Sequence, residues 1–131
     1  MKKVRKKWRF SGMCWGDVDA VLGVVSAENA LRVRRLMPDT KILAFMDAPE
    51  DLDAFLQMDV EYIRLWEAWI TEERVEKIHA AGKKLWVMAC DPMENRCGYT
   101  TRKAMRAFRE MGADAVLIND IPWAIETLKE K

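Results

Sequence analysis

The chain has 131 residues, of which 50% are hydrophobic and 33% charged, and its formal net charge is +1. This length suits one domain, and the composition excludes a disordered or low-complexity chain. No apolar run approaches the 18 or more residues of a transmembrane helix, so we expect no membrane span.

Residues 1–19 form a basic arm and lead-in, with five positive charges between Lys2 and Lys7. The arm is either a contact for phosphate or anionic lipid or a solvated terminus. Without it the rest of the chain is mildly acidic, and we expect no nucleic-acid partner. The polar segment 11–17 is not the apolar core of a signal peptide, so we expect a cytoplasmic protein with reduced thiols.

Five short apolar runs rich in Val, Ile, Leu, Met and aromatic residues follow the arm, within residues 20–131. Their hydrophobicity is continuous, as in parallel strands that are covered on both faces. The predicted strands are Ala20–Val25, Ile42–Met46, Tyr62–Trp66, Leu85–Cys90 and Ala115–Ile118.

Helix-starting signals follow each predicted strand. Ser26, Asp47, Thr71, Thr100 or Thr101, and Asp120 each stand where a helix N-terminus is expected. Five βα units therefore succeed one another. Two α/β architectures fit them: a partial (βα)8 TIM barrel, or half-barrel, with every helix outside, and a flavodoxin-like doubly wound sheet with helices on both faces.

In either architecture, polar residues near the carboxyl ends of the strands share one rim, where ligands bind in such folds. The candidates for ligand binding are Ser26, Arg64, Trp66, Asn119 and Asp120. A guanidinium at Arg64 suits a phosphate or a carboxylate, and the alternative is an ion pair with Glu61 or Glu67. Trp66, Trp69 and Trp86 either line a pocket together or belong to the core.

The residues offer no complete catalytic constellation. A response-regulator acid cluster, a G-x-G-x-x-G motif and a Walker A motif are all missing, and we assign neither catalytic nor metal-binding residues. His79, the single histidine, lies inside a predicted helix, where packing is the simpler role than general-base chemistry. Cys90 and Cys97 are either a redox pair or two unrelated thiols, one at a strand end and one in the loop 91–99.

The closing segment 112–122, Gly-Ala-Asp-Ala-Val-Leu-Ile-Asn-Asp-Ile-Pro, resembles the last strand of glycerophosphodiester phosphodiesterases, with the pattern G-x-D-G-[IV]-[IL]-T-[DN]-x-P. Ala115 replaces a Gly of that pattern and Asn119 replaces a Thr. Segment 24–39 resembles that family's fourth strand with its helix and turn, and segment 70–82 resembles a later helical unit. Over residues 20 to 128, the resemblance covers strands four to eight of an eight-stranded barrel.

The resemblance implies a (βα)8 origin in lipid metabolism and a phosphoric diester hydrolase. It also implies Ca²⁺ or Mg²⁺ as cofactor if the full barrel is assembled. The family's catalytic histidines and metal-binding acids lie in its first three strands, which have no counterpart here. Ser26-Ala27 and Met88-Ala89 also replace a Ser-Phe and a Trp-Thr pair of the family's pocket.

Two kinds of function follow as expectations. The first is phosphodiester hydrolysis once an N-terminal catalytic half-barrel is supplied, and the second is a non-catalytic module for anion binding or assembly. A phosphate-bearing small molecule is the expected ligand. Because a half-barrel leaves one sheet face and two edge strands uncovered, we also expect a homo-oligomer or a complementing half-barrel as partner.

Overall fold

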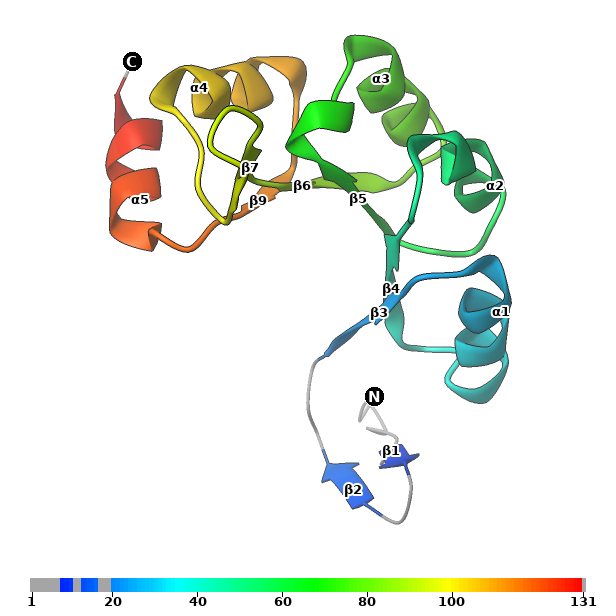
Figure 1. The fold of residues 1–131 in the computed structure, drawn as a ribbon. Helices are drawn as coiled ribbons and strands as arrows, with labels where there is room; N and C mark the ends of the chain where they lie inside the picture. Colours follow the sequence, from blue (N-terminus) through cyan, green and yellow to red (C-terminus); the bar gives the residue numbers. More distant parts are fainter. Residues whose placement is uncertain (1–7, 11–12, 17–19, 131) are drawn as a thin grey trace, which may run out of the picture.

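A computed structural model describes residues 8–10, 13–16 and 20–130 (Figure 1). The first of these form two short strands, β1 (Trp8–Phe10) and β2 (Met13–Gly16), which pair antiparallel. The basic residues from Lys2 to Lys7 lie outside the described residues, as do residues 11–12 and 17–19 of the predicted lead-in.

The main sheet has five parallel strands: β3 (Val21–Val24), β4 (Lys41–Phe45), β5 (Tyr62–Trp66), β6 (Lys84–Met88) and β9 (Ala115–Leu117). Their spatial order, β3-β4-β5-β6-β9, follows the chain without a reversal. A doubly wound sheet requires a reversal of strand order, so the flavodoxin-like alternative is wrong. The sheet is open, and its five strands curve like part of a barrel wall (Figure 1).

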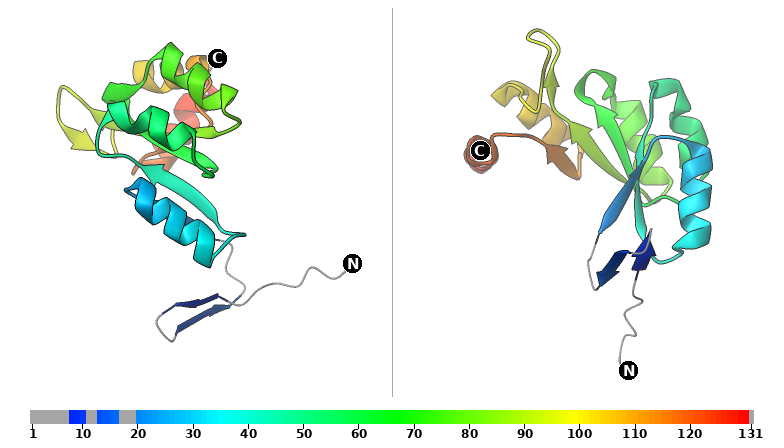
Figure 2. Two further views of the ribbon diagram at one scale, coloured as in Figure 1. Left: turned by 90° about the vertical axis from the view of Figure 1, so that its right-hand side faces the viewer. Right: turned by 60° about the horizontal axis from the view of Figure 1, so that its bottom comes forward.

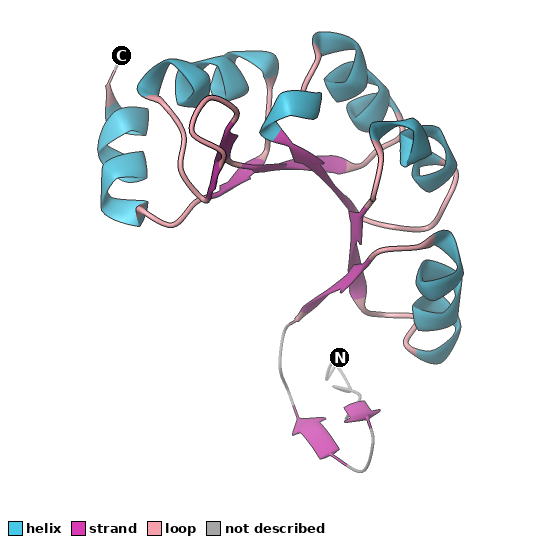
Figure 3. Ribbon diagram, in the orientation of Figure 1, coloured by secondary structure: helices cyan, strands magenta, loops and turns pink. Residues whose placement is uncertain are grey.

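The helices that connect these strands lie on the convex side of the curved sheet (Figure 3). They are α1 (Ala27–Leu36), α2 (Leu52–Leu56) with the 3-10 turn η1 (Pro49–Asp51) before it, α3 (Glu72–Ala80) after the turn η2 (Glu67–Trp69), and α4 (Arg102–Met111). The last helix, α5 (Ile121–Lys129), follows β9 and lies beside α4. In the described part of the chain no helix has the length and apolar character to cross a bilayer.

The helix ends follow the local chemistry of the sequence. Ser26, Thr71, Thr101 and Asp120 each accept a hydrogen bond from a backbone N–H three residues ahead, so these predicted caps are confirmed. Asp47 is the exception. The second helical segment begins with Pro49 in η1, after Ala48, which provides no side-chain cap.

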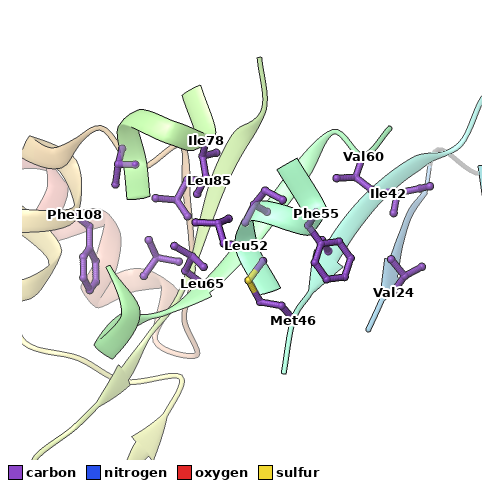
Figure 4. Packing of buried hydrophobic residues seen from close by; sticks show 14 of the residues in the cluster. Val24, Ile42, Met46, Leu52, Phe55, Val60, Leu65, Ile78, Leu85 and Phe108 are labelled. Carbon is purple, nitrogen blue, oxygen red and sulfur yellow. The ribbon is translucent and has the colours of Figure 1, made fainter. Parts of the chain in front are cut away.

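The core lies between the sheet and the helices on its convex side (Figure 4). Every second residue of the central strands faces the helices, and Ile63, Leu65 and Val87 are 0% exposed. Phe55 of α2 and Phe108 of α4 close this layer from the helix side. Burial of these apolar side chains stabilises the fold by roughly 1.5–3 kcal/mol for each large one.

The segment expected to be a loop, residues 91–99, contains a hairpin. Cys90–Asp91 (β7) pairs antiparallel with Arg96–Cys97 (β8), and Asn95 turns the chain with a φ of 51°. Figure 2 shows the hairpin extending away from the sheet, beyond the end of β6. Strands of two residues are too short to show a hydrophobic periodicity, so the sequence does not predict them.

Candidate functional site

The concave face of the sheet carries a row of aromatic and cationic side chains. Parallel register places Phe45 of β4 beside Arg64 of β5, and Arg64 beside Trp86 of β6. Trp66 lies two residues after Arg64, on the same face of β5. Arg64 therefore has aromatic residues as neighbours on β4, β5 and β6, in the middle of the five-strand sheet.

The guanidinium of Arg64 rests on two of these rings. Its Cζ lies 4.1 Å from the centre of the Phe45 ring and 4.9 Å from that of Trp66. Both distances are within the range of cation–π attraction. Arg64 Nε is buried and has no hydrogen-bond partner in the described part of the chain. Burial also lowers the pKa of Arg64 from its usual value, although a guanidinium stays charged at neutral pH.

The two carboxylates proposed as alternative partners of Arg64 are engaged elsewhere. Glu61 accepts hydrogen bonds from Arg34, at 2.8 Å, and from Ile42 N–H, at 2.6 Å. Glu67 accepts from Cys90 N–H, at 3.0 Å, and from the Thr100 hydroxyl, at 2.7 Å. The alternative of an ion pair between Arg64 and a neighbouring Glu is not seen among the described residues.

The three tryptophans that the sequence groups together are divided between the two faces of the sheet. Trp66 and Trp86 belong to the concave row, where the Trp86 ring lies 4.9 Å from that of Tyr62. Trp69, in η2, packs instead against the buried cluster under the helices. Only two of the three therefore contribute to a surface around Arg64.

Sequence reasoning missed Phe45 and Gly23. A Cβ at Gly23 would overlap the ring of Phe45, so the glycine makes room for that ring on the concave face. The signal was present in the alternation of β4, because Phe45 lies on the opposite face from Ala44, which is 0% exposed. The alternation alone does not place Phe45 beside Arg64, because that also requires the register between β4 and β5.

The remaining rim candidates do not converge on Arg64. The Ser26 hydroxyl caps α1 through Asn29 N–H, at 3.1 Å, and the Asp120 carboxylate caps α5 through Trp123 N–H, at 3.1 Å. Ser26 follows β3 and Asp120 follows β9, each two strands from β5, or roughly 10 Å across the sheet. Both side chains serve helix termini at separate ends of the arc.

Asn119 holds the β7–β8 hairpin instead of facing the aromatic row. Its backbone N–H donates to Gly98 O, at 2.8 Å. Its side chain lies directly against the Cα of Gly98, which has a φ of 85°. Together these contacts fasten the base of the hairpin to the end of β9.

His79 is far from the concave row, at the other end of the strands. It lies in the last turn of α3 and contacts Asp114, with 2.9 Å between Nε2 and Oδ2. Asp114 precedes β9 and also accepts a hydrogen bond from Leu85 N–H, at 2.8 Å. Burial acts to raise the pKa of Asp114, but the bonds from Leu85 and His79 outweigh it and lower that pKa. This contact is structural, because the amino ends of barrel strands serve stability.

A cavity of about 270 Å³ lies away from these residues, between η1, α2 and α3. Three of its lining charges pair with one another, since Lys77 is 3.1 Å from Glu73 and 3.8 Å from Asp53. Among the described residues, no three His, Cys, Asp or Glu side chains come together as metal ligands would. The concave row is therefore the best candidate for a site.

Comparison with known proteins finds no family model that matches this sequence and no curated protein with significant similarity to it. Function has to be argued from the residues themselves. The described concave row offers a half-buried cation that contacts two aromatic rings. That arrangement suits recognition of an oxyanion next to an apolar or planar group.

Proposed function

We propose that this half-barrel binds a phosphate-bearing small molecule on the concave face of its sheet, at Arg64. The observation that supports the proposal is the buried, unpartnered Nε of Arg64 between the Phe45 and Trp66 rings. A polar group left without a partner costs free energy, and an oxyanion would remove that cost. The rings also fix the guanidinium, so less side-chain entropy is lost on binding.

Titration with inorganic phosphate and with glycerol 3-phosphate, followed by NMR, tests this proposal. We expect the indole signals of Trp66 and Trp86 to shift together on titration. Arg64→Met should abolish both shifts, because the thioether keeps the apolar contacts and removes the charge.

Arg96 offers a matched control, since its guanidinium lies 3.9 Å from the ring centre of Tyr99 on the exposed hairpin. Arg96→Met should leave the Trp66 and Trp86 shifts unchanged. Equal shifts in the chain and in Arg64→Met, or none in either, would contradict phosphate binding at Arg64.

We further propose that phosphoric diester hydrolysis, the activity implied by the glycerophosphodiester phosphodiesterase resemblance, requires a complementing N-terminal half-barrel that brings the acid, the base and the metal ligands. Sequential parallel strands with helices on one side support a barrel-type ancestry. The described concave face supplies a cation but no acid-base pair, because His79 is bound to Asp114 at the opposite end.

Assay of the purified chain with glycerophosphocholine and Ca²⁺ or Mg²⁺ tests this second step. We expect no release of glycerol 3-phosphate at an enzymatic rate from the chain alone. Metal-dependent turnover that survives His79→Ala and disappears with Asp120→Ala would contradict the expectation and reveal a catalytic site in this chain.

Assembly with a second copy is a further candidate function, favoured by where apolar residues are exposed. In the described part of the chain, all of them except Met93 and Tyr99, which lie in or beside the hairpin, belong to the first and last βα units. The helices α2, α3 and α4 expose no large apolar side chain. Those of the two end units are Val21, Val25, Leu31, Leu36, Ile121, Ile125 and Leu128. We propose that the β9 and α5 end of one copy packs against the β3 and α1 end of another. Each such contact covers one patch and one edge strand of each copy, and a closed assembly covers both ends of every copy.

Light scattering across a micromolar concentration range tests the assembly, and we expect mass to increase with concentration. Leu31→Lys and Ile125→Lys should each shift the chain toward monomer. Met93→Lys is the matched control, because Met93 is 91% exposed on the hairpin and belongs to neither end. A monomer at every concentration would rule out self-assembly, and a complementing half-barrel would remain as partner.

A further inference from the structure

The β7–β8 hairpin brings two cysteines together. Cys90 and Cys97 are direct partners in the antiparallel register, and their Sγ atoms are 3.1 Å apart. Cys97 is exposed and Cys90 is half-buried. The hairpin therefore places two free thiols in contact at the surface, near the carboxyl end of β5.

We propose that Cys90 and Cys97 form a reversible intrachain disulfide by exchange with a low-molecular-weight disulfide such as oxidised glutathione. The Cys97 thiolate attacks one glutathione sulfur, which breaks the glutathione S–S bond, forms a mixed disulfide and releases one glutathione. Cys90 then loses its proton, attacks Cys97 Sγ and displaces the second glutathione. Two protein thiols are oxidised and one glutathione disulfide is reduced to two thiols.

The backbone already has the geometry that such a bond requires. Cys90 N–H donates to Glu67, and Gly98 N–H donates to Ala89 O, at 2.7 Å, so the ladder bonds flank the cysteine pair. Residues opposite each other at such a position have Cα atoms about 4.5 Å apart, at the short end of the disulfide range. The sulfurs need to approach by only about 1 Å to reach bonding distance.

The order of the two steps follows from the environment of each thiol. The hydrogen bond with Cys97 and then burial raise the pKa of the Cys90 thiol to about 11, so Cys90 is protonated at neutral pH. The exposed Cys97 is therefore the thiol that meets a soluble disulfide first. Once Cys97 carries glutathione, Cys90 is its nearest nucleophile, because both lie in the same hairpin.

Glu67 connects the hairpin to the end of β5. Glu67 binds Cys90 N–H with one carboxylate oxygen and the Thr100 hydroxyl with the other, and Glu67 directly follows Trp66. Closing the disulfide fixes the hairpin between these anchors and beside the end of β5. The disulfide forms within the hairpin alone and does not require phosphate binding at Arg64.

A glutathione redox titration of the whole chain tests the proposal. Samples are equilibrated at a series of ratios of oxidised to reduced glutathione, quenched with an alkylating reagent, digested and mapped by mass spectrometry. A synthetic peptide of residues 88–99 is the reference, since it has the same spacing of thiols without the folded anchors at Glu67 and Asn119. Peptide mapping distinguishes Cys14 from the other two thiols without any substitution.

We expect Cys90 and Cys97 of the protein to lose their alkylation together and to appear as one linked peptide. The ratio of oxidised to reduced glutathione at which half of the protein is oxidised should be at least about tenfold lower than for the peptide. The reason is that the fold holds the two sulfurs close together. Reduction should restore both thiols, and Cys90→Ser should leave glutathione attached to Cys97. Equal ratios for protein and peptide, a disulfide between chains, or glutathione on Cys97 of the wild-type chain without bridging would overturn the proposal.

Discussion

The two faces of the five-strand sheet are built from the same strands and differ completely in environment. On the convex face Ile63 and Leu65 are fully buried under helices. On the concave face the next residues along β5, Arg64 and Trp66, are only half-buried and stack on one another. A parallel sheet normally has both faces covered. The difference shows that, among the described residues, the core lies on one face of the sheet and the other face is left partly exposed.

The largest expected effect comes from comparing neighbours on β5 that face opposite ways. Leu65→Ala should lower the free energy of unfolding by about 3 kcal/mol, because it opens a cavity in the core. Trp66→Ala should cost less than half as much, since the described helices lie on the other face of the sheet. Urea denaturation of both variants measures this. Equal losses would mean that the concave face is also covered in solution, by a second copy or another chain.

A smaller loss of stability is expected from polar contacts at the amino ends of the strands. There Glu61, just before β5, binds the backbone of β4, and this contact belongs to neither face of the sheet. Glu61→Gln keeps the side-chain shape but weakens the bonds to Arg34 and Ile42 N–H. We expect a loss of about 1.5 kcal/mol, typical of hydrogen bonds to a charged group. Glu126→Gln, on the exposed face of α5, is the control and should change stability by less than about 0.5 kcal/mol. Similar values for the two variants would contradict this role of Glu61.

The pH dependence of Asp114 gives the next effect. Because its folded pKa is lowered, Asp114 stabilises the fold above its unfolded pKa of about 3.9, and this contribution is lost as pH falls through the folded value. Asp114→Asn should therefore be less stable than the wild type at pH 6, by about 1 kcal/mol. The two should converge below about pH 4. A gap that stays constant from pH 6 to 3 would show that the charge of Asp114 is not involved.

The smallest effect on stability concerns Arg64. Arg64→Met removes a buried unpartnered Nε and also the cation–π contacts with Phe45 and Trp66. These changes oppose each other, so we expect the free energy of unfolding to change by less than about 1 kcal/mol. Thermal denaturation measures it. A large loss would mean that Arg64 supports the fold, which would weaken the argument that it is kept for a ligand.

Much of the fold was predictable because its signals are local. Continuous apolar runs predicted the five strands to within two residues at each end. The hydroxyl and carboxylate caps predicted four helix starts. The choice between half-barrel and doubly wound sheet was not predictable from periodicity. It depends on the order of strands in space, and both orders bury the same runs.

The site was predictable only in part, for a similar reason. Arg64 and Trp66 stand two residues apart on one strand, so their shared face could be inferred from sequence. Phe45 joins them through register between strands that the sequence does not specify. The positions of Ser26 and Asp120 just after strands predict a ligand-binding role. Their side chains instead cap helices, a role that a position just before a helix predicts equally well.

The sequential strand order has a consequence for how the molecule loses its structure. Each inner βα unit pairs with the unit before it and the unit after it, so stability is shared between nearest neighbours, much as in a short repeat array. The units at β3 and β9 lack one neighbour within the described sheet and should fray first, while β5 at the centre should open only on global unfolding. The rate of amide hydrogen exchange would then decrease from β3 and from β9 toward β5. Contacts of another chain with the edge strands would reduce this difference in rate.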